Sequence, residues 1–445
     1  MTTEPIGATR RFGLTDQEAF AALSGDFNPI HVDPVAARRT LFGEPVVHGL
    51  HLVLWALDVR LGQGALPPLQ NIRAGFKSPV LLGRMATLRW EGETAEIHCD
   101  GALAAEIVLS KGGTGAALPH PAGGPALPVP APVAQTPETI GTSSGRLAPA
   151  LSPDRLVRLF PNLADRSDPG LVAALLATTR IVGMECPGLH SLFSELDLDI
   201  DGAGATPGGI DWQCSLFHPE LRLTEVEVEG AGVSGTLTAF LRPEAVRQLA
   251  AADAADHLQR AGLATGCYAG RHALVVGGSR GLGEAAAKLL AAGGAHVTLT
   301  YASGMVDAAR VVAEIVEAGG RAETLALDAT APPPALPDSI THVAYFASPK
   351  IRQGAAAGGF DAELFAAYAA FFVDGFARLA NALPRAALLY PSTTFIDTAE
   401  PRFAEYAAAK AAGETLCAFL RASNPDRPVS APRLPRLATD QNAAI

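Results

Sequence analysis

The 445-residue sequence has no uninterrupted apolar run long enough to cross a membrane. Its longest mainly apolar segment, residues 365–383, contains Asp374 and Arg378, whereas a spanning helix needs ~18 consecutive apolar residues. The first residues, Met-Thr-Thr-Glu-Pro, lack the basic start and apolar run of a secretory signal. We therefore expect a cytoplasmic protein that does not engage a membrane.

Cysteine and positive charge are also scarce. The five cysteines show no Cys-x-x-Cys or other metal-ligand spacing, so we expect reduced thiols and neither a metal site nor a disulfide framework. The 34 Lys and Arg residues are outnumbered by 45 Asp and Glu residues, which gives a formal net charge of -11. This charge would repel a phosphate backbone, so we expect no nucleic-acid partner.

The composition that remains is that of a folded, multidomain protein. Hydrophobic residues make up 48% of the chain and charged residues 18%, which is typical of globular proteins. The length predicts about three domains. Residues 118–141 are rich in Pro, Ala and Gly without apolar periodicity, as in an extended linker. The expected division is a first, catalytic domain (1–117), this linker (118–141), a second, degenerate copy (142–245), a linker helix (246–270) and a last domain (271–445).

The segments on either side of the linker resemble two copies of one unit. A shift of 139 positions aligns residues 48–58 with residues 187–197, and five of the eleven pairs are identical. We read both segments as helices, each followed by three runs of strand-like composition. These runs are residues 86–90, 95–99 and 102–110 in the first copy and residues 210–217, 221–228 and 235–240 in the second. A helix followed by an antiparallel meander, twice, predicts an α+β double hot-dog.

The first copy holds a carboxylic acid and an imidazole in one short turn. The segment Ser24-Gly-Asp-Phe-Asn-Pro-Ile-His-Val-Asp33 places Asp26 and His31 five positions apart, with Asn28 and Pro29 between them. Pro fixes its own backbone and Asn hydrogen-bonds its neighbours, so both reactive side chains would face one water. Taken alone, such a string is more often a surface Asx turn with an incidental histidine.

The context of this turn carries a family resemblance. The turn is followed by the segment 41–49, which ends in Pro-Val-Val-His-Gly, and by the strand-like segment 73–80. With these segments, residues 10–112 resemble MaoC-like, (R)-specific enoyl-thioester hydratases. The resemblance implies a hot-dog fold. It also implies interconversion of 3-hydroxyacyl and trans-2-enoyl thioesters, with acyl-CoA or an acyl carrier protein as the carrier.

The chemistry of hydration assigns roles to these residues. Adding water to an enoyl thioester needs a base, an acid for C2 and donors for the enolate oxygen. The resemblance implies Asp26 and His31 as the catalytic pair and Gly49, at a helix start, as the oxyanion contact. Asn28 and His48 are the expected substrate contacts, although a structural role at the helix start is an equal alternative for His48.

The second copy carries no such motif. Its segment 171–184 contains Arg180 but no acid and base pair, so we expect a catalytically silent half that completes the sheet and walls the acyl tunnel. His190 is expected to pack within a helix. Asp197 and Asp199 are expected to be solvated.

The last domain begins as a dinucleotide-binding fold does. The apolar strand His272–Val276 runs into Gly277-Gly-Ser-Arg-Gly-Leu-Gly283 and then into an Ala-rich helix, so a pyrophosphate would meet backbone N–H groups at the helix start. Tyr406 and Lys410 lie four positions apart, on one face of a helix. Together these features resemble the short-chain dehydrogenase/reductase family over residues 271–441, with an α/β Rossmann-like doubly wound parallel sheet.

This resemblance implies a second set of site residues. Tyr406 would protonate a carbonyl oxygen, and Lys410 would lower the pKa of that phenol and bind the nicotinamide ribose. A hydroxyl about thirteen residues before the tyrosine completes the family's catalytic set; the spacing selects Thr393, whereas Ser392 has the commoner side chain, and the choice stays open. The expected cofactor contacts are Gly277, Ser279, Arg280, Gly281, Leu282, Gly283, Thr300, Tyr301, Asp328 and Lys410.

The cofactor is expected to be NADP. No acid ends the second strand, Thr298–Tyr301, where NAD enzymes place one for the ribose 2'-hydroxyl, and Arg280 and Thr300 suit a 2'-phosphate. Two departures from the family stand out: residues 346–349 replace its Asn-Ala-Gly, and Asp374 replaces a helix Asn. We also expect the last domain to be C-terminally truncated, without the substrate lid of the family.

The two resemblances together predict a bifunctional enzyme of the fatty-acid or polyketide type. NADPH would reduce a 3-oxoacyl thioester, and the 3-hydroxyacyl product would be dehydrated at the first site. Two alternatives remain: a hydratase with an inactive dinucleotide domain, and a non-catalytic acyl-thioester binding module. A homodimer is a further expectation.

Overall fold

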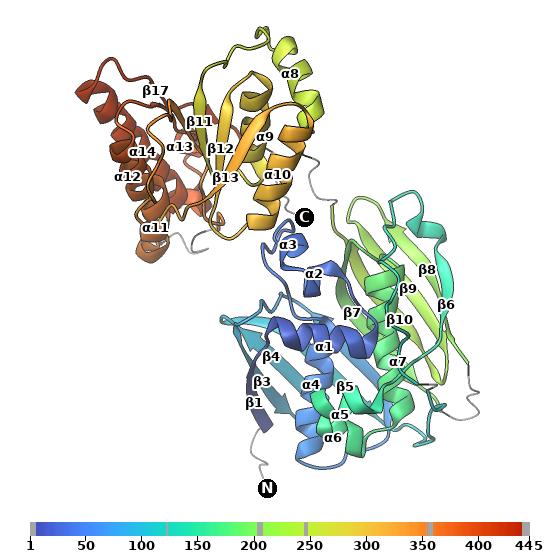
Figure 1. The fold of residues 1–445 in the computed structure, drawn as a ribbon. Coiled ribbons are helices and arrows are strands. Elements are labelled where there is room, and N and C mark those ends of the chain that lie inside the picture. The colour runs from blue at the N-terminus through green and yellow to red at the C-terminus, as the bar shows by residue number, and fades with distance from the viewer. Residues whose placement is uncertain are drawn as a thin grey trace. The chain divides into compact units, whose positions relative to one another are not determined.

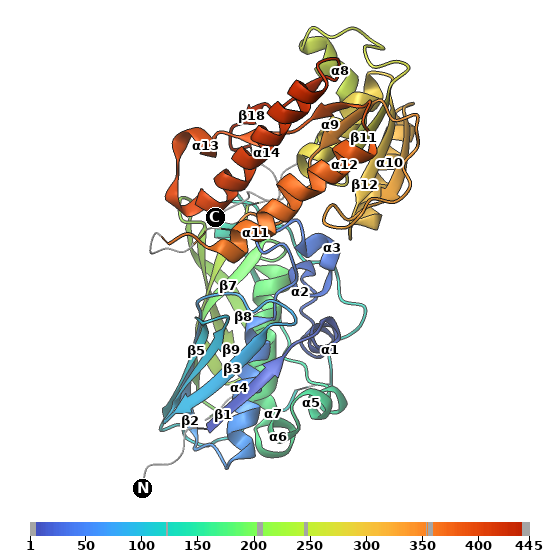
Figure 2. The same ribbon diagram turned by 90° about the vertical axis from the view of Figure 1, so that its left-hand side faces the viewer.

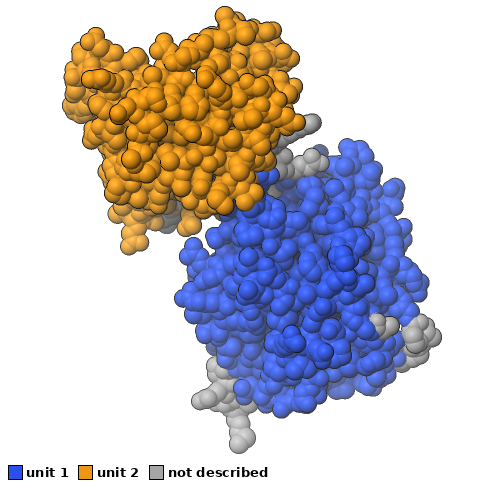
Figure 3. Space-filling model, in the orientation of Figure 1, with its two compact units in different colours: residues 1–244, 445 blue, residues 245–444 orange. Residues whose placement is uncertain are grey.

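A computed structural model describes residues 6–121, 123–202, 208–243, 248–352, 354 and 359–437. Their contacts divide the chain into two compact units, residues 1–244 (with residue 445) and residues 245–444 (Figure 3). In this described part, no helix combines the length and the hydropathy that a membrane span requires.

Unit 1 is built on one ten-stranded antiparallel sheet (Figure 1). Its order, β1-β3-β4-β5-β2-β7-β10-β9-β8-β6, places five strands from each half on either side of the β2–β7 junction. The first five are β1 (Ile6–Arg11), β2 (Leu69–Phe76), β3 (Met85–Glu91), β4 (Thr94–Cys99) and β5 (Ala102–Lys111). The second five are β6 (Ser144–Leu147), β7 (Ser191–Ile200), β8 (Ile210–His218), β9 (Leu223–Gly230) and β10 (Val233–Leu241).

Each half wraps its strands around one long apolar helix. The helices are α4 (Gly49–Gly62) and α7 (Pro169–Arg180), and the π-helical turn η2 (Ile181–Glu185) continues α7. Both long helices are largely buried in a single core, against the inward residues of strands that alternate between core and solvent. Two such helix-and-sheet units sharing one sheet form the expected double hot-dog. The shorter helices of this unit are α1 (Leu14–Ser24), α2 (Pro29–Val32), α3 (Pro34–Ala37), η1 (Ile140–Thr142), α5 (Pro153–Leu159) and α6 (Pro161–Arg166).

The expected alignment of the two copies was wrong. Residues 187–197 do not form a helix; they form a turn and most of strand β7, and the counterpart of α4 is α7. His190 therefore lies in a turn and not in a helix. Asp197 is also bonded across the junction, because Arg73 donates to its Oδ2 from Nε at 2.9 Å.

Unit 2 is a doubly wound α/β fold (Figure 2). Its parallel sheet has the order β13-β12-β11-β14-β15-β17, the 3-2-1-4-5-6 pattern of dinucleotide-binding folds. The strands are β11 (His272–Val276), β12 (His296–Tyr301), β13 (Arg321–Ala326), β14 (His342–Tyr345), β15 (Ala387–Leu389) and β17 (Val429–Ser430), and β16 (Ser392–Thr393) pairs separately with β18 (Arg433–Leu434).

Helices cover both faces of this sheet. One core joins the sheet to α9 (Gly281–Ala292) and α10 (Met305–Glu317), and a second joins it to α12 (Phe376–Ala382) and α14 (Ala404–Ser423). Successive residues of β11 enter different cores, Val275 the first and Val276 the second, because side chains alternate along a strand. The remaining helices are η3 (Ala251–Asp253), α8 (Ala254–Arg260), α11 (Ala362–Ala369), η4 (Ala370–Gly375), α13 (Phe395–Thr398) and η5 (Pro401–Phe403).

Candidate active sites

The loop after α1 positions Asp26 and His31. Helix α1 ends at Gly25, whose φ of 78° lies in the left-handed region that glycine tolerates. Asn28 then caps α2 by accepting a hydrogen bond from the Ile30 N–H, and Pro29 fills the first helical position. The sequence therefore builds a short, stiff link that begins at the acid and ends at the imidazole.

The carboxyl group of Asp26 is almost completely buried. Its exposure is 2%, and its oxygens accept hydrogen bonds from the Asn28 N–H at 3.2 Å and from Thr179 Oγ1 at 2.7 Å. Burial raises the pKa of Asp26 to about 6, against the lowering effect of the two hydrogen bonds. Asp26 therefore changes its protonation state close to neutral pH, as an acid–base group should.

His31 is held as a neutral base. Its Nδ1 lies 2.8 Å from the Val46 carbonyl oxygen, which only accepts, so Nδ1 carries the hydrogen and Nε2 keeps a lone pair. Burial lowers the pKa of His31 to about 4, which favours this neutral form. The ring stacks on that of His48 with 3.8 Å between centroids.

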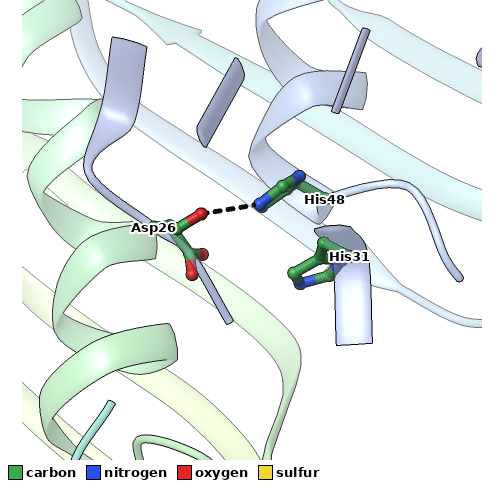
Figure 4. Close-up of side chains that lie close together, drawn as sticks. All are labelled: Asp26, His31 and His48. Atoms are coloured by element: carbon green, nitrogen blue, oxygen red, sulfur yellow. Dashed lines mark hydrogen bonds between the residues drawn. The ribbon is translucent and has the colours of Figure 1, made fainter. Parts of the chain in front are cut away.

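Asp26 and His31 lie on either side of one small space (Figure 4). A carboxylate oxygen of Asp26 and ring nitrogens of His31 and His48 all lie within 4.8 Å of one another. One water between the carboxylate and the imidazole would hydrogen-bond to both.

A pocket of about 260 Å³ adjoins this pair. Gly49, at the first position of α4, lines it together with Phe76, and a Cβ at Gly49 would lie only 2.8 Å from the Phe76 ring. The first N–H groups of a helix have no intrahelical partner and carry its positive dipole end, which suits an oxyanion. The mainly apolar lining comes from both halves of unit 1 and includes Ile30, Val46, Leu52, Val80, Thr179, Val182, Gly183, Leu192 and Phe240.

The expected substrate contacts of Asn28 and His48 are not what the structure shows. Asn28 is fully buried, and its Nδ2 donates to the carbonyls of Gly183 and Gly188, each at 3.0 Å. His48 bonds to Gln17 Oε1 through Nδ1 and to the Asp26 carbonyl through Nε2. Both side chains are therefore engaged in holding the catalytic loop, and the structural alternative holds for His48.

The glycine-rich loop of unit 2 has the shape of a phosphate cradle. Gly277 has a φ of 76°, and a Cβ there would lie 2.9 Å from the Ala347 N. A Cβ at Gly283 would lie 2.2 Å from the Gly277 carbonyl oxygen. Helix α9 begins at Gly281, directly after Ser279 and Arg280, so its N-terminal dipole faces this loop. These residues fit a dinucleotide pyrophosphate.

Thr300 does not take the expected role beside a 2'-phosphate. It is 1% exposed, and its Oγ1 accepts a hydrogen bond from the Gly277 N–H at 3.1 Å. Thr300 therefore holds the first residue of the glycine-rich loop. The neighbouring Tyr301 is half-buried at the end of β12, and the exposed Asp328 accepts from the Thr330 N–H.

Tyr406 and Lys410 share one face of α14 but are not coupled as expected. Burial raises the pKa of Tyr406 to about 12, and a hydrogen bond with Thr393 opposes this rise. Lys410 donates to the Pro391 carbonyl at 2.7 Å and lies over the ring of Phe372, 4.1 Å from its centroid. Burial lowers the pKa of Lys410 to about 7. Burial thus raises the pKa of the Tyr406 phenol, while the Lys410 ammonium donates to the Pro391 carbonyl.

Of the two candidate hydroxyls, Thr393 is the one that meets the tyrosine. The Thr393 hydroxyl is buried and lies close enough to Tyr406 to lower the pKa of its phenol, whereas the buried Ser392 Oγ has no hydrogen-bond partner among the described residues. The spacing argument and the structure thus agree on which hydroxyl lies next to Tyr406.

Fold and site define a double hot-dog of the hydratase type followed by a dinucleotide-binding domain. Residues 3–107 match the family described as "MaoC like domain", and residues 271–343 match "short chain dehydrogenase", a stretch that ends before Tyr406 and Lys410. The chain is 44% identical over 87 residues to an (R)-specific enoyl-CoA hydratase from Aeromonas caviae, with 19% of this chain and 63% of that protein covered. It is 35% identical over 111 residues to a 3-hydroxybutyryl-CoA dehydratase from Methylorubrum extorquens, with 22% of this chain and 69% of that protein covered.

The chain therefore belongs to the MaoC-like dehydratase family, with a short-chain dehydrogenase domain fused after the hot-dog unit. Among solved structures, it is similar to a 3-oxoacyl (acyl-carrier-protein) reductase from Agrobacterium tumefaciens with NADP bound. That similarity has 24% sequence identity and a TM-score of 0.36, and covers 40% of this chain and 74% of the other.

Proposed function

We propose that unit 1 interconverts 3-hydroxyacyl and trans-2-enoyl thioesters at Asp26 and His31. The observation that carries the proposal is the pair itself: a buried carboxyl group and a half-buried imidazole within 4.8 Å of each other, beside a mainly apolar pocket. The relatives named as a hydratase and a dehydratase of CoA thioesters support the substrate class.

The reaction balances without a net change in protonation of the site. In hydration, the water oxygen bonds to C3, one water proton passes to the pair, and a proton returns from the pair to C2. The ionised Asp26 carboxylate takes the water proton and returns it to C2, while neutral His31 accepts a hydrogen bond from the same water through Nε2. The Gly49 N–H at the start of α4, which lines the pocket, would stabilise the enolate oxygen.

The experiment for this half is loss of the enoyl-thioester absorbance of crotonyl-CoA. Wild-type protein is expected to consume the signal, and Asp26→Asn is expected to abolish the loss because the carboxylate is removed with its shape kept. A non-catalytic acyl-binding module would leave the absorbance unchanged with wild-type protein.

For unit 2 we propose reduction of a 3-oxoacyl thioester with NADPH. Gly277, Gly281 and Gly283 would cradle the pyrophosphate, and the bound cofactor would supply the hydride. Tyr406 would protonate the carbonyl oxygen, and the Thr393 hydroxyl would orient it. The absence of an acid at the end of β12 favours NADP over NAD.

The two reactions share a 3-hydroxyacyl thioester, which is the chemical reason to fuse these units. The carrier would be CoA or an acyl carrier protein. A second candidate, a hydratase with a silent dinucleotide domain, is favoured by one observation: Lys410 is engaged by Pro391 and Phe372, and the pKa of Tyr406 is raised. NADPH oxidation with an acetoacetyl thioester separates the two, since a silent domain would leave NADPH unconsumed.

A further inference from the structure

The second half of unit 1 contacts the catalytic acid directly, although it lacks an acid–base pair of its own. Thr179, in the last turn of α7, is 3% exposed and donates from Oγ1 to Asp26 Oδ2 at 2.7 Å. The two residues are 153 positions apart in the chain. The Asp26 carboxyl group is therefore contacted by helix α7 of the second half.

The turn after Thr179 closes around the same carboxyl group. Residues Ile181–Glu185 form a π-helical turn, a feature that often marks functional sites within α-helices. Gly183 in this turn packs so closely that a Cβ would lie 2.2 Å from Asp26 Oδ1. The turn thus leaves room for the carboxyl group and for little else.

Groups of the second half also fix the loop that follows Asp26. The Phe27 N–H donates to Met184 Sδ at 3.2 Å, and Asn28 Nδ2 donates to the carbonyls of Gly183 and Gly188. Because the backbone is held in this way, the orientation of the Asp26 side chain depends on the groups that hydrogen-bond to its oxygens. These are the Asn28 N–H on Oδ1 and the Thr179 hydroxyl on Oδ2.

We propose that Thr179 is a positioning residue of the hydratase, which holds the Asp26 carboxylate towards His31 and favours its ionised form. The inference rests on the function proposed for unit 1 and deepens it: the half without acid–base residues completes the active site. A hydroxyl donor to a buried carboxylate stabilises the charged state, so its removal raises the pKa of that group. Among the described residues, the titratable and charged groups near this pair include His31, His48, Arg180, whose side chain passes beside Gly25, and Arg242, which lowers the pKa of His31.

Neighbouring threonines offer a matched pair of variants. Thr178 is also buried in α7, but its Oγ1 donates only to a helix carbonyl, that of Leu175, at 2.8 Å. Thr179→Val and Thr178→Val both replace a buried hydroxyl by a methyl group of similar size. Only the first removes a hydrogen bond to Asp26.

The test is the pH profile of crotonyl-CoA hydration for wild type, Thr179→Val, Thr179→Ser and Thr178→Val. Thr179→Val is expected to lower kcat about tenfold or more with KM nearly unchanged, since a hydrogen bond to a charged group is lost. Its acid limb is expected to move up by about one pH unit. Thr179→Ser should restore both, and Thr178→Val should match wild type.

Three outcomes overturn the inference. Thr179→Val with the kcat and acid limb of wild type would show that the hydroxyl does not act on Asp26. Equal losses in Thr178→Val and Thr179→Val would show a packing effect of α7. Absence of hydration by the wild-type protein would overturn the proposed function itself, which distinguishes that failure from the first two.

Discussion

A single methyl group at Gly183 is predicted to disable the hydratase. In Gly183→Ala, the new Cβ would lie 2.2 Å from Asp26 Oδ1 and 2.5 Å from Cγ, whereas ordinary contacts begin at 3.4 Å. The carboxyl group, or the π-helical turn, must therefore move by at least 0.8 Å to reach 3.0 Å, below which Cβ contacts are essentially never seen, and by 1.2 Å to reach ordinary contact at 3.4 Å. A displacement of ~1 Å in a reacting group costs on the order of 10²-fold in rate.

The assay is kcat/KM for hydration of crotonyl-CoA, with a glycine variant as the control. Gly141→Ala adds the same methyl group in the short helix η1, where no atom lies within 4 Å of the new Cβ. We expect a loss of about a hundredfold for Gly183→Ala and wild-type activity for Gly141→Ala. Wild-type activity in Gly183→Ala would refute the claim that Asp26 is confined by the second half of unit 1.

Further predictions concern stability and the division of labour between the units. Asp26→Asn should be inactive in hydration. Above pH 6 it should also be more stable than the wild type, by at most about 3 kcal/mol. Folding raises the pKa of the buried acid from 3.8 to about 6, and one pKa unit is worth about 1.4 kcal/mol. Because the pKa is raised, ionised Asp26 destabilises the folded state at high pH. In denaturant melts below about pH 4, wild type and Asp26→Asn should therefore have the same free energy of unfolding. Tyr406→Phe should abolish NADPH oxidation with acetoacetyl-CoA and leave crotonyl-CoA hydration intact; loss of both would contradict independent sites. Thr393→Val should reduce that oxidation more than Ser392→Ala does, because the Thr393 hydroxyl lies close enough to Tyr406 to lower the pKa of its phenol; the reverse order of initial rates would reassign the hydroxyl.

The catalytic loop was predictable from the sequence because it is local. Asp26 and His31 lie within one turn, and the torsional limits of Asn28 and Pro29 set the backbone between them, which groups of the second half then hold. The strands of both halves were readable for a similar reason, since apolar and polar residues alternate along them.

What the sequence did not reveal depends on contacts between distant segments. Thr179 and Gly183 reach Asp26 only after the two halves pack, and nothing in their own neighbourhood indicates a site. The helix expected over residues 187–197 was misread from its leucines, although Leu196, Leu198 and Ile200 alternate with acids in the pattern of a strand. The role expected for Thr300 beside a 2'-phosphate was wrong, because its position near the end of a strand does not reveal that its hydroxyl bonds to the Gly277 N–H.

The central claim, that Asp26 and His31 act together on one water, is tested most directly by a double-variant measurement. The quantity is kcat/KM for crotonyl-CoA hydration in Asp26→Asn, His31→Asn and the variant that carries both changes. Residues that act as a unit give strongly non-additive losses, so we expect the double variant to be about as impaired as the worse single variant. Losses that multiply in the double variant would contradict the shared water and would assign the two groups to separate steps.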